Sequence, residues 1–176
     1  MKSILILLLA SLTLACTAAD KPEPEAKNPN KIIFLIGDGM GLSAVSTGFY
    51  FSDQPSVFNR FHEIGLQQTS SAIQKVTDSA ASATSMASGK KTYNGAIGVD
   101  TTKNAIPNIA EMVASSGWST GVVATSTISH ATPASFYAHV INRGMEEEIA
   151  AQLLDSEIDF FAGGGRDKFE YRRDSV

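Results

Sequence analysis

A carboxylate flanked by glycines is the first feature whose residue types could do chemistry. Asp38 stands in Gly-Asp-Gly-Met-Gly, directly after the apolar run of residues 32–36. At the end of a buried strand, a carboxylate is costly unless it accepts hydrogen bonds or binds a cation, and flanking glycines let the backbone turn closely around a ligand. From spacing alone, Asp38 could equally be a cation ligand or a turn residue that caps the segment from Met40 onward. A dinucleotide fingerprint is excluded, because Gly41 comes one residue too early.

A serine at a predicted helix start is the second candidate. Residues 78–88 are rich in Ala, Ser and Thr and precede Gly89, a pattern typical of a helix with a glycine stop. Ser79 would lie in the first turn, where the dipole and free N–H groups favour an anion or a developing alkoxide. Asp78 would either cap this helix or attract a cationic partner. For a serine-rich helix start taken alone, a simple cap is the more frequent explanation.

An imidazole and a hydroxyl follow the apolar residues 118–125, which are typical of a buried strand. His130 could equally be a solvated loop residue. Thr132 precedes Pro133, and this pair is typical of a helix N-cap.

Arg143 closes the helix predicted over residues 133–143. Its guanidinium can bind an oxyanion through two parallel hydrogen bonds or complement the helix C-terminus. A single helix would separate its Cα from that of Thr132 by about 16 Å, so the arginine would have to reach back or the helix bend. His62 and His139 have no partner in this pattern and are interpreted as surface or packing residues.

Strands and helices are predicted to alternate along the folded part. Strands are expected over residues 32–36, 67–73, 118–125 and 158–161, and helices over residues 40–50, 78–88, 107–116, 133–143 and 145–154. This alternation indicates the α/β class, with a parallel-type central sheet and flanking helices. Because ligands bind at the carboxyl ends of such strands, Asp38 and the segment after Thr125 are expected at one edge.

Composition bounds the remaining possibilities. The 176 residues carry a net charge of −4 and a single cysteine. The length allows one domain with a substantial core. The acidic balance argues against nucleic-acid binding, and one cysteine excludes an intrachain disulfide framework or a cysteine-based zinc module.

The N-terminus is predicted to be a targeting segment and a linker. Residues 1–15 are typical of a signal peptide, with an apolar run shorter than the roughly 20 residues that span a bilayer. Cys16 then resembles a bacterial lipoprotein box, although Leu is more usual where Thr13 stands, and a plain signal peptide is the alternative. A lipidated cysteine would anchor the chain to a membrane surface. Residues 16–30 predict a flexible linker, and residues 31–176 the folded domain of a secreted or periplasmic protein.

Taken together, the motifs resemble the alkaline phosphatase family. The matching segments are residues 33–41, 76–84, 91–100, 130–133, 138–140 and 163–165. The resemblance runs from about residue 31 to the end, in the family's order. It implies an alkaline phosphatase-like fold and a secreted, metal-dependent phosphomonoesterase that acts on small phosphomonoesters. It also implies two zinc ions, one magnesium ion and, in many members, a homodimer.

The resemblance assigns the metal ligands. The aspartate matching Asp38 bridges a zinc and the magnesium ion, and the serine matching Ser79 shares that zinc. The threonine matching Thr132 ligates magnesium. The position of His130 is Asp in some members and His in others, and it acts mostly through magnesium-bound water.

The resemblance also implies the catalytic roles. The serine matching Ser79 attacks phosphorus and becomes a phosphoserine. The arginine matching Arg143 clamps the phosphate, and the aspartate matching Asp78 orients that arginine. A phosphodiesterase or sulfatase of the same superfamily is disfavoured, because those enzymes usually carry Thr or a modified Cys as nucleophile.

Family members are longer than this chain, which resembles their N-terminal portion. Their remaining metal ligands are an Asp/His pair, an Asp-x-x-x-His pair, another His and a Glu, and residues 166–176 hold no histidine that could replace them. We therefore expect little or no phosphatase activity from this chain alone. The alternative is a non-catalytic tethered lipoprotein with residual metal or phosphate binding.

Overall fold

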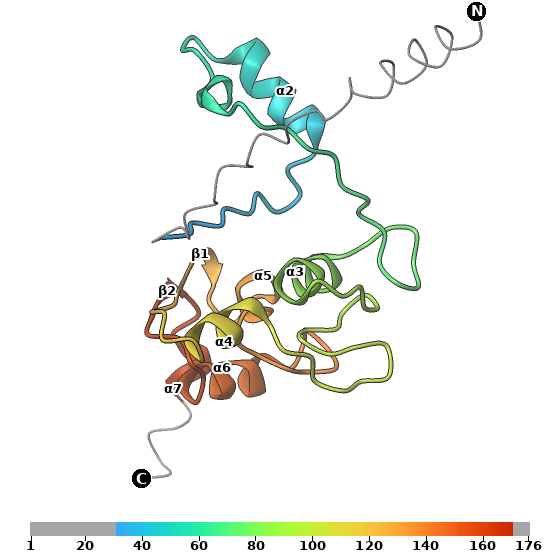
Figure 1. The fold of residues 1–176 in the computed structure, drawn as a ribbon, viewed down its shortest axis with the longest axis vertical. Helices are drawn as coiled ribbons and strands as arrows, with labels where there is room; N and C mark the ends of the chain where they lie inside the picture. The colour runs from blue at the N-terminus through green and yellow to red at the C-terminus, as the bar shows by residue number, and fades with distance from the viewer. Residues whose placement is uncertain (1–30, 171–176) are drawn as a thin grey trace, which may run out of the picture. The chain divides into compact units, whose positions relative to one another are not determined.

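The computed structural model describes residues 31–170 (Figure 1). The chain divides into two compact units, Met1–Ile36 and Gly37–Val176. The predicted signal peptide, Cys16 and the whole predicted linker cannot be compared with the structure, since residues 1–30 lie outside the described residues. Every candidate site residue belongs to the second unit.

The second unit begins with two helices that bury nothing. Helix α2 (Leu42–Phe51) confirms the helix predicted over residues 40–50 within two residues, and the 3-10 helix η1 (Val57–Arg60) follows it. Neither contains a buried residue. The ring of Phe58 lies 6.3 Å from that of Phe49, between centroids, so aromatic contact contributes apolar packing in this region.

The sheet lies in the C-terminal part of the chain. Strands β1 (Gly121–Thr127) and β2 (Phe160–Gly164) pair in parallel, with Gly121 opposite Phe160. The chain crosses from one to the other through α5 (Ala131–Ala134) and α6 (Glu146–Leu154). A parallel pair joined by a helical crossover confirms the predicted α/β class.

The core lies beside this sheet. Ile97, Ile128, Ile149 and Leu153 are its largest fully buried hydrophobic side chains, each exposed by 2% or less. Helix α3 (Ser79–Ser88) contacts both α4 (Ile109–Ala114) and α5, and α6 contacts α7 (Asp167–Glu170) (Figure 1). The small residues of α3 fit this arrangement, since Ala80, Ala81, Ala83, Thr84 and Ala87 are all buried.

Local capping explains where the helices begin and end. The carboxylate of Asp78 accepts the backbone N–H of Ala81 at 2.9 Å and starts α3, and Gly89 ends it with φ 71°. Asn108 starts α4 in a capping box with Glu111. These caps follow from neighbouring residues. The predicted limits agree within one residue for α3, whereas the predicted helix over residues 107–116 is two residues too long at each end of α4.

Two predicted strands are wrong. Residues 32–36 and 67–73 form no strand, and within residues 31–170 only β1 and β2 make a sheet. The apolar run nevertheless lies open, with Ile33 84% and Leu35 82% exposed. Hydrophobic sequence is therefore not sufficient for a strand, because a strand also needs a neighbour to bond along its backbone.

The helix predicted over residues 133–143 is also wrong in length. Helix α5 has four residues, and further along the backbone of Val140 exchanges two hydrogen bonds with Ile97 in an antiparallel bridge. Backbone groups that bond across to another segment cannot also bond within a helix. The chain therefore turns after α5.

In residues 31–170, no helix is long and apolar enough to cross a membrane.

Candidate active site

Asp38 joins the hydroxyls of two helices, α3 and α5, which are far apart in the sequence but contact each other. The hydroxyl of Ser79 donates to Oδ1 of Asp38 at 3.1 Å, and the hydroxyl of Thr132 donates to Oδ2 at 3.2 Å. The turn around Asp38 is set by Gly39, whose φ of 68° favours glycine. Asp38 and the segment after Thr125 were expected at one edge of the sheet. They do meet, since Asp38 contacts Thr132 just beyond the carboxyl end of β1, although residues 32–36 form no strand.

Ser79 is the first residue of α3 and is partly exposed. Its neighbours Ala80 and Ala81 are fully buried, which fixes the first turn against the core and leaves the hydroxyl on the accessible side. The hydroxyl lies where the free N–H groups of a helix start favour negative charge. The position suits a nucleophile that becomes an alkoxide and then carries a phosphoryl group.

Both interpretations of Asp78 are correct at once. Oδ1 caps α3 through Ala81, and Oδ2 accepts the backbone N–H of Gly95 at 3.0 Å. Oδ2 also pairs with Nη1 of Arg143 at 3.2 Å. One carboxylate therefore fixes the serine helix, the turn containing Gly95 and the arginine.

Arg143 carries a second contact, to an imidazole. Its Nη2 lies 3.1 Å from Nε2 of His130. Since a guanidinium can only donate, Nε2 of His130 must be the acceptor, and a neutral ring then holds its proton on Nδ1. The guanidinium is partly open, with 32% of the side chain exposed. An oxyanion can therefore reach it from solvent while Asp78 contacts Nη1 and His130 contacts Nη2.

Thr132 is not a helix N-cap, the alternative that its place before Pro133 had left open. The N-cap of α5 is His130, and Thr132 is the second residue within the helix. Its hydroxyl is consequently free of a capping role and donates to Asp38. Because α5 is short, the chain turns after it and brings Arg143 to His130. The separation of about 16 Å between Thr132 and Arg143 that a single helix would impose therefore does not arise.

The oxygen atoms of Asp38, Ser79 and Thr132 are hard donors of the kind that Mg²⁺ prefers. Their convergence fits part of a magnesium or zinc site. Within residues 31–170, no group of three or more His, Cys, Asp or Glu side chains could hold a metal ion. The donor set is thus compatible with a metal but incomplete.

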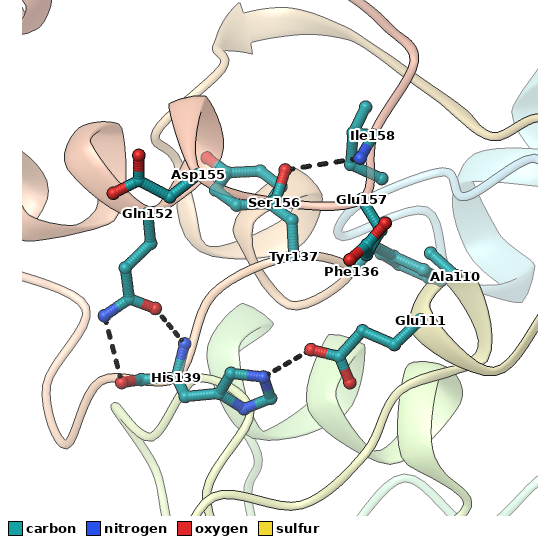
Figure 2. A pocket seen from close by; sticks show the side chains of 10 residues that line it. All are labelled: Ala110, Glu111, Phe136, Tyr137, His139, Gln152, Asp155, Ser156, Glu157 and Ile158. Carbon is teal, nitrogen blue, oxygen red and sulfur yellow. Dashed lines mark hydrogen bonds and ion pairs between the residues drawn. The ribbon is translucent and has the colours of Figure 1, made fainter. Parts of the chain in front are cut away.

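A pocket of about 300 Å³ lies elsewhere, between α4 and α6 (Figure 2). Its lining includes Glu111, His139 and Gln152 and none of the candidate site residues. His139, for which the sequence pattern identified no partner, has two in the structure. Both nitrogens of its ring lie 2.6 Å from an oxygen, one from the Gly98 carbonyl and one from Glu111. The capping pattern Asn-x-x-Glu, which places Glu111, was the available sequence signal for one partner.

The chain belongs to the alkaline phosphatase family, whose sequence model matches residues 26–175. It is 38% identical to alkaline phosphatase 3 of Bacillus subtilis over 193 aligned positions, which cover 96% of this chain and 42% of that protein. It is 34% identical to the Escherichia coli alkaline phosphatase, covering 87% of this chain and 39% of the relative. This chain therefore spans about two fifths of the length of these curated relatives.

Solved structures agree with the family assignment. The alkaline phosphatase of the Antarctic bacterium TAB5 superimposes with a TM-score of 0.76 at 53% identity, over 79% of this chain and 41% of that one. A variant of the TAB5 enzyme, with the same TM-score, is described with Mg bound in its M3 site. The cold-active enzyme of a Shewanella species gives 0.72 at 39% identity. The fold is thus the alkaline phosphatase fold, incomplete relative to these homologues.

Proposed function

We propose that this chain forms the nucleophile and phosphate-binding side of a phosphomonoesterase site. Ser79 is the nucleophile, Arg143 binds the phosphate oxygens, and Asp78 orients the arginine. The observation that carries the proposal is the hydrogen bond between Ser79, at the start of α3, and Asp38. It joins a potential nucleophile to a carboxylate 41 residues away in the sequence.

The chemistry follows from these positions. The Oγ–phosphorus bond to Ser79 would form as the bond from phosphorus to the leaving alcohol oxygen breaks, and water would later release the phosphate from the serine. Arg143 presents a partly open fork of donors that suits the phosphate oxygens. Because phosphoryl transfer relies on positioning and charge, holding Ser79 and Arg143 in fixed places through Asp78 is the main contribution of this chain.

We further propose that Asp38, Ser79 and Thr132, with His130 nearby, hold parts of sites for two zinc ions and one magnesium ion. Such ions would supply positive charge that lowers the pKa of a coordinated hydroxyl. The donors in residues 31–170 do not complete any of the three sites. We therefore expect this chain alone to hydrolyse phosphomonoesters weakly or not at all.

A phosphoserine trap tests the assignment. The zinc- and magnesium-loaded chain is incubated with radiolabelled inorganic phosphate at acidic pH, quenched and digested. We expect a label on Ser79 that disappears in Ser79→Ala. Ser82→Ala is the matched control, because Ser82 lies in the same helix but bonds Thr77 at 2.9 Å. A label that survives Ser79→Ala, or no label in the unaltered chain, contradicts the nucleophile assignment.

The incomplete donor set favours a second candidate, a non-catalytic protein with residual metal or phosphate affinity. We propose in addition that the protein is secreted or periplasmic, with Cys16 as a lipid attachment site, and that it forms a homodimer as family members often do. Zinc titration without any serine labelling would favour the non-catalytic protein. Mass spectrometry of the mature N-terminus tests lipidation at Cys16, and sedimentation tests the dimer.

A further inference from the structure

We propose that His139, which the family resemblance leaves without a role, is a positioning residue for Arg143. The proposal rests on the phosphate-binding role given to Arg143 above. His139 is four residues before the arginine and fixes the far end of the backbone segment that delivers it.

The ring of His139 is held at both nitrogens. Nδ1 lies 2.6 Å from the carbonyl oxygen of Gly98. Nε2 lies 2.6 Å from Oε1 of Glu111, a contact drawn in Figure 2. A carbonyl oxygen can only accept, so Nδ1 must donate. The contact between Nε2 and the Glu111 carboxylate is an ion pair when the ring carries both protons, and such charge-assisted hydrogen bonds are stronger than neutral ones.

The partners of His139 are themselves fixed. Oε2 of Glu111 accepts the backbone N–H of Asn108 at 2.9 Å in the capping box of α4. The side-chain amide of Gln152, in α6, accepts the backbone N–H of His139 at 2.7 Å and donates to its carbonyl oxygen at 3.3 Å. Figure 2 shows the contacts of His139 with Gln152 and Glu111 along one wall of the pocket. His139 is therefore clamped by two helices.

A short antiparallel ladder connects this clamp to the arginine. Ile97 and Val140 exchange backbone hydrogen bonds of 3.0 and 2.9 Å, and the N–H of Arg143 donates to the carbonyl oxygen of Gly95 at 2.7 Å. The N–H of Gly95 donates in turn to Oδ2 of Asp78, the oxygen that pairs with the guanidinium. The hydrogen bond between Gly98 and His139 thus lies at one end of this pair of segments, and Arg143 lies at the other end.

The packing at Gly98 indicates that the clamp is built closely. Gly98 has φ 60°, and a Cβ there would collide with the carbonyl oxygen of Ala138 and lie 2.7 Å from Nδ1 of His139. The absence of a side chain lets the two segments approach. Loss of the bond from Nδ1 to Gly98 is therefore expected to loosen the ladder and, with it, the backbone of Arg143.

Two conservative variants separate this role from packing. The amide nitrogen of Asn in His139→Asn replaces Nδ1 and can still donate to Gly98. The amide nitrogen of Gln in His139→Gln replaces Nε2 and can reach Glu111 but not Gly98. We measure backbone amide exchange in the full chain by NMR. The amide of Ile149 in α6, bonded to Met145 at 3.0 Å, is the internal reference.

We expect His139→Gln to speed exchange of the Val140 and Arg143 amides about tenfold, the effect of losing one hydrogen bond. His139→Asn should leave both amides within about threefold of the unaltered chain. Equal acceleration by both variants, or no acceleration by Gln, overturns the proposal.

A measurement on the unaltered chain keeps the proposal testable if a variant fails to fold. The ¹⁵N shifts of the His139 ring must report a protonated Nδ1, and an unprotonated Nδ1 overturns the clamp. Titration with inorganic phosphate, followed at the Arg143 side-chain resonances, tests the proposed function separately. If phosphate does not shift the Arg143 resonances but His139→Gln still speeds amide exchange more than His139→Asn, the phosphate-binding role is refuted. The positioning of Arg143 by His139 is then supported by itself.

Discussion

Two regions of the second unit contribute to one site in different ways. Residues 37–66 bury no side chain, and Leu42 and Phe51 are 81% and 83% exposed. The region from α3 to β2 holds the core, where Ile97 and Leu153 are 0% and 2% exposed. Asp38 comes from the exposed region. Its partners Ser79 and Thr132 stand on helices anchored in the core, so the site joins a packed half to a half that lacks a core of its own.

The largest expected contrast comes from matched leucines. Leu153→Ala in α6 should lower the free energy of unfolding by about 2–5 kcal/mol, since it removes a buried side chain and leaves a cavity. Leu42→Ala in α2 should change it by less than about 0.5 kcal/mol. Urea unfolding followed by circular dichroism measures both. Similar losses for the two variants would break the comparison.

Matched glycines give the next effect. Gly98 and Gly39 have positive φ values of 60° and 68°, but a Cβ meets nothing within 4 Å at Gly39. Gly39→Ala should cost about 1 kcal/mol from backbone strain alone. Gly98→Ala adds a collision with backbone and should cost about 3 kcal/mol. If thermal unfolding shows the same loss of stability for Gly39→Ala and Gly98→Ala, the backbone segments do not approach closely at Gly98.

Alkaline pH sharpens the comparison further. Tyr137 is buried and its hydroxyl donates to the carbonyl oxygen of Ile128 at 2.7 Å. Burial raises the pKa of this phenol above its usual 10.0. The unfolded chain loses the proton near pH 10 and the folded chain does not, so this contribution to stability is complete below pH 10 and declines above it.

Tyr137→Phe should therefore flatten the fall of stability above pH 10, and it should cost about 1 kcal/mol at pH 7 through the lost hydrogen bond. Unfolding curves at several pH values measure both effects. Tyr50→Phe, at a side chain that is 83% exposed, is the control and should leave stability at pH 7 within about 0.5 kcal/mol. An unchanged alkaline slope in Tyr137→Phe would contradict the assigned burial.

The smallest effect is expected in the exposed region. Phe58 contacts Phe49 and Phe61, each at 6.3 Å between ring centroids. Aromatic pairs contribute about 0.5–1.5 kcal/mol locally. Phe58→Ala should speed amide exchange in α2 and leave the midpoint of core unfolding unchanged. A shift of that midpoint as large as that of Leu153→Ala would show that the two regions unfold together.

Much of the site was predictable because its residues stand in short sequence patterns that indicate the local structure. The run around Ser79 fixes a helix start through Asp78 and a helix end through Gly89, so α3 followed from neighbouring residues. The glycines around Asp38 indicated a turn that brings a carboxylate to a ligand edge. The pairing of Asp78 with Arg143 was implied by the family resemblance, and the structure places the two side chains in contact.

Sequence alone thus determined the α/β class, the two caps of α3 and the residue types of the site, since these depend on periodicity and on contacts a few residues apart. Only the tertiary structure decided that α5 ends after four residues, that residues 32–36 form no strand and that His139 is clamped. Each depends on which distant backbone or side-chain group satisfies a hydrogen bond. Val140 bonds Ile97 across the fold, and no local pattern encodes that partner.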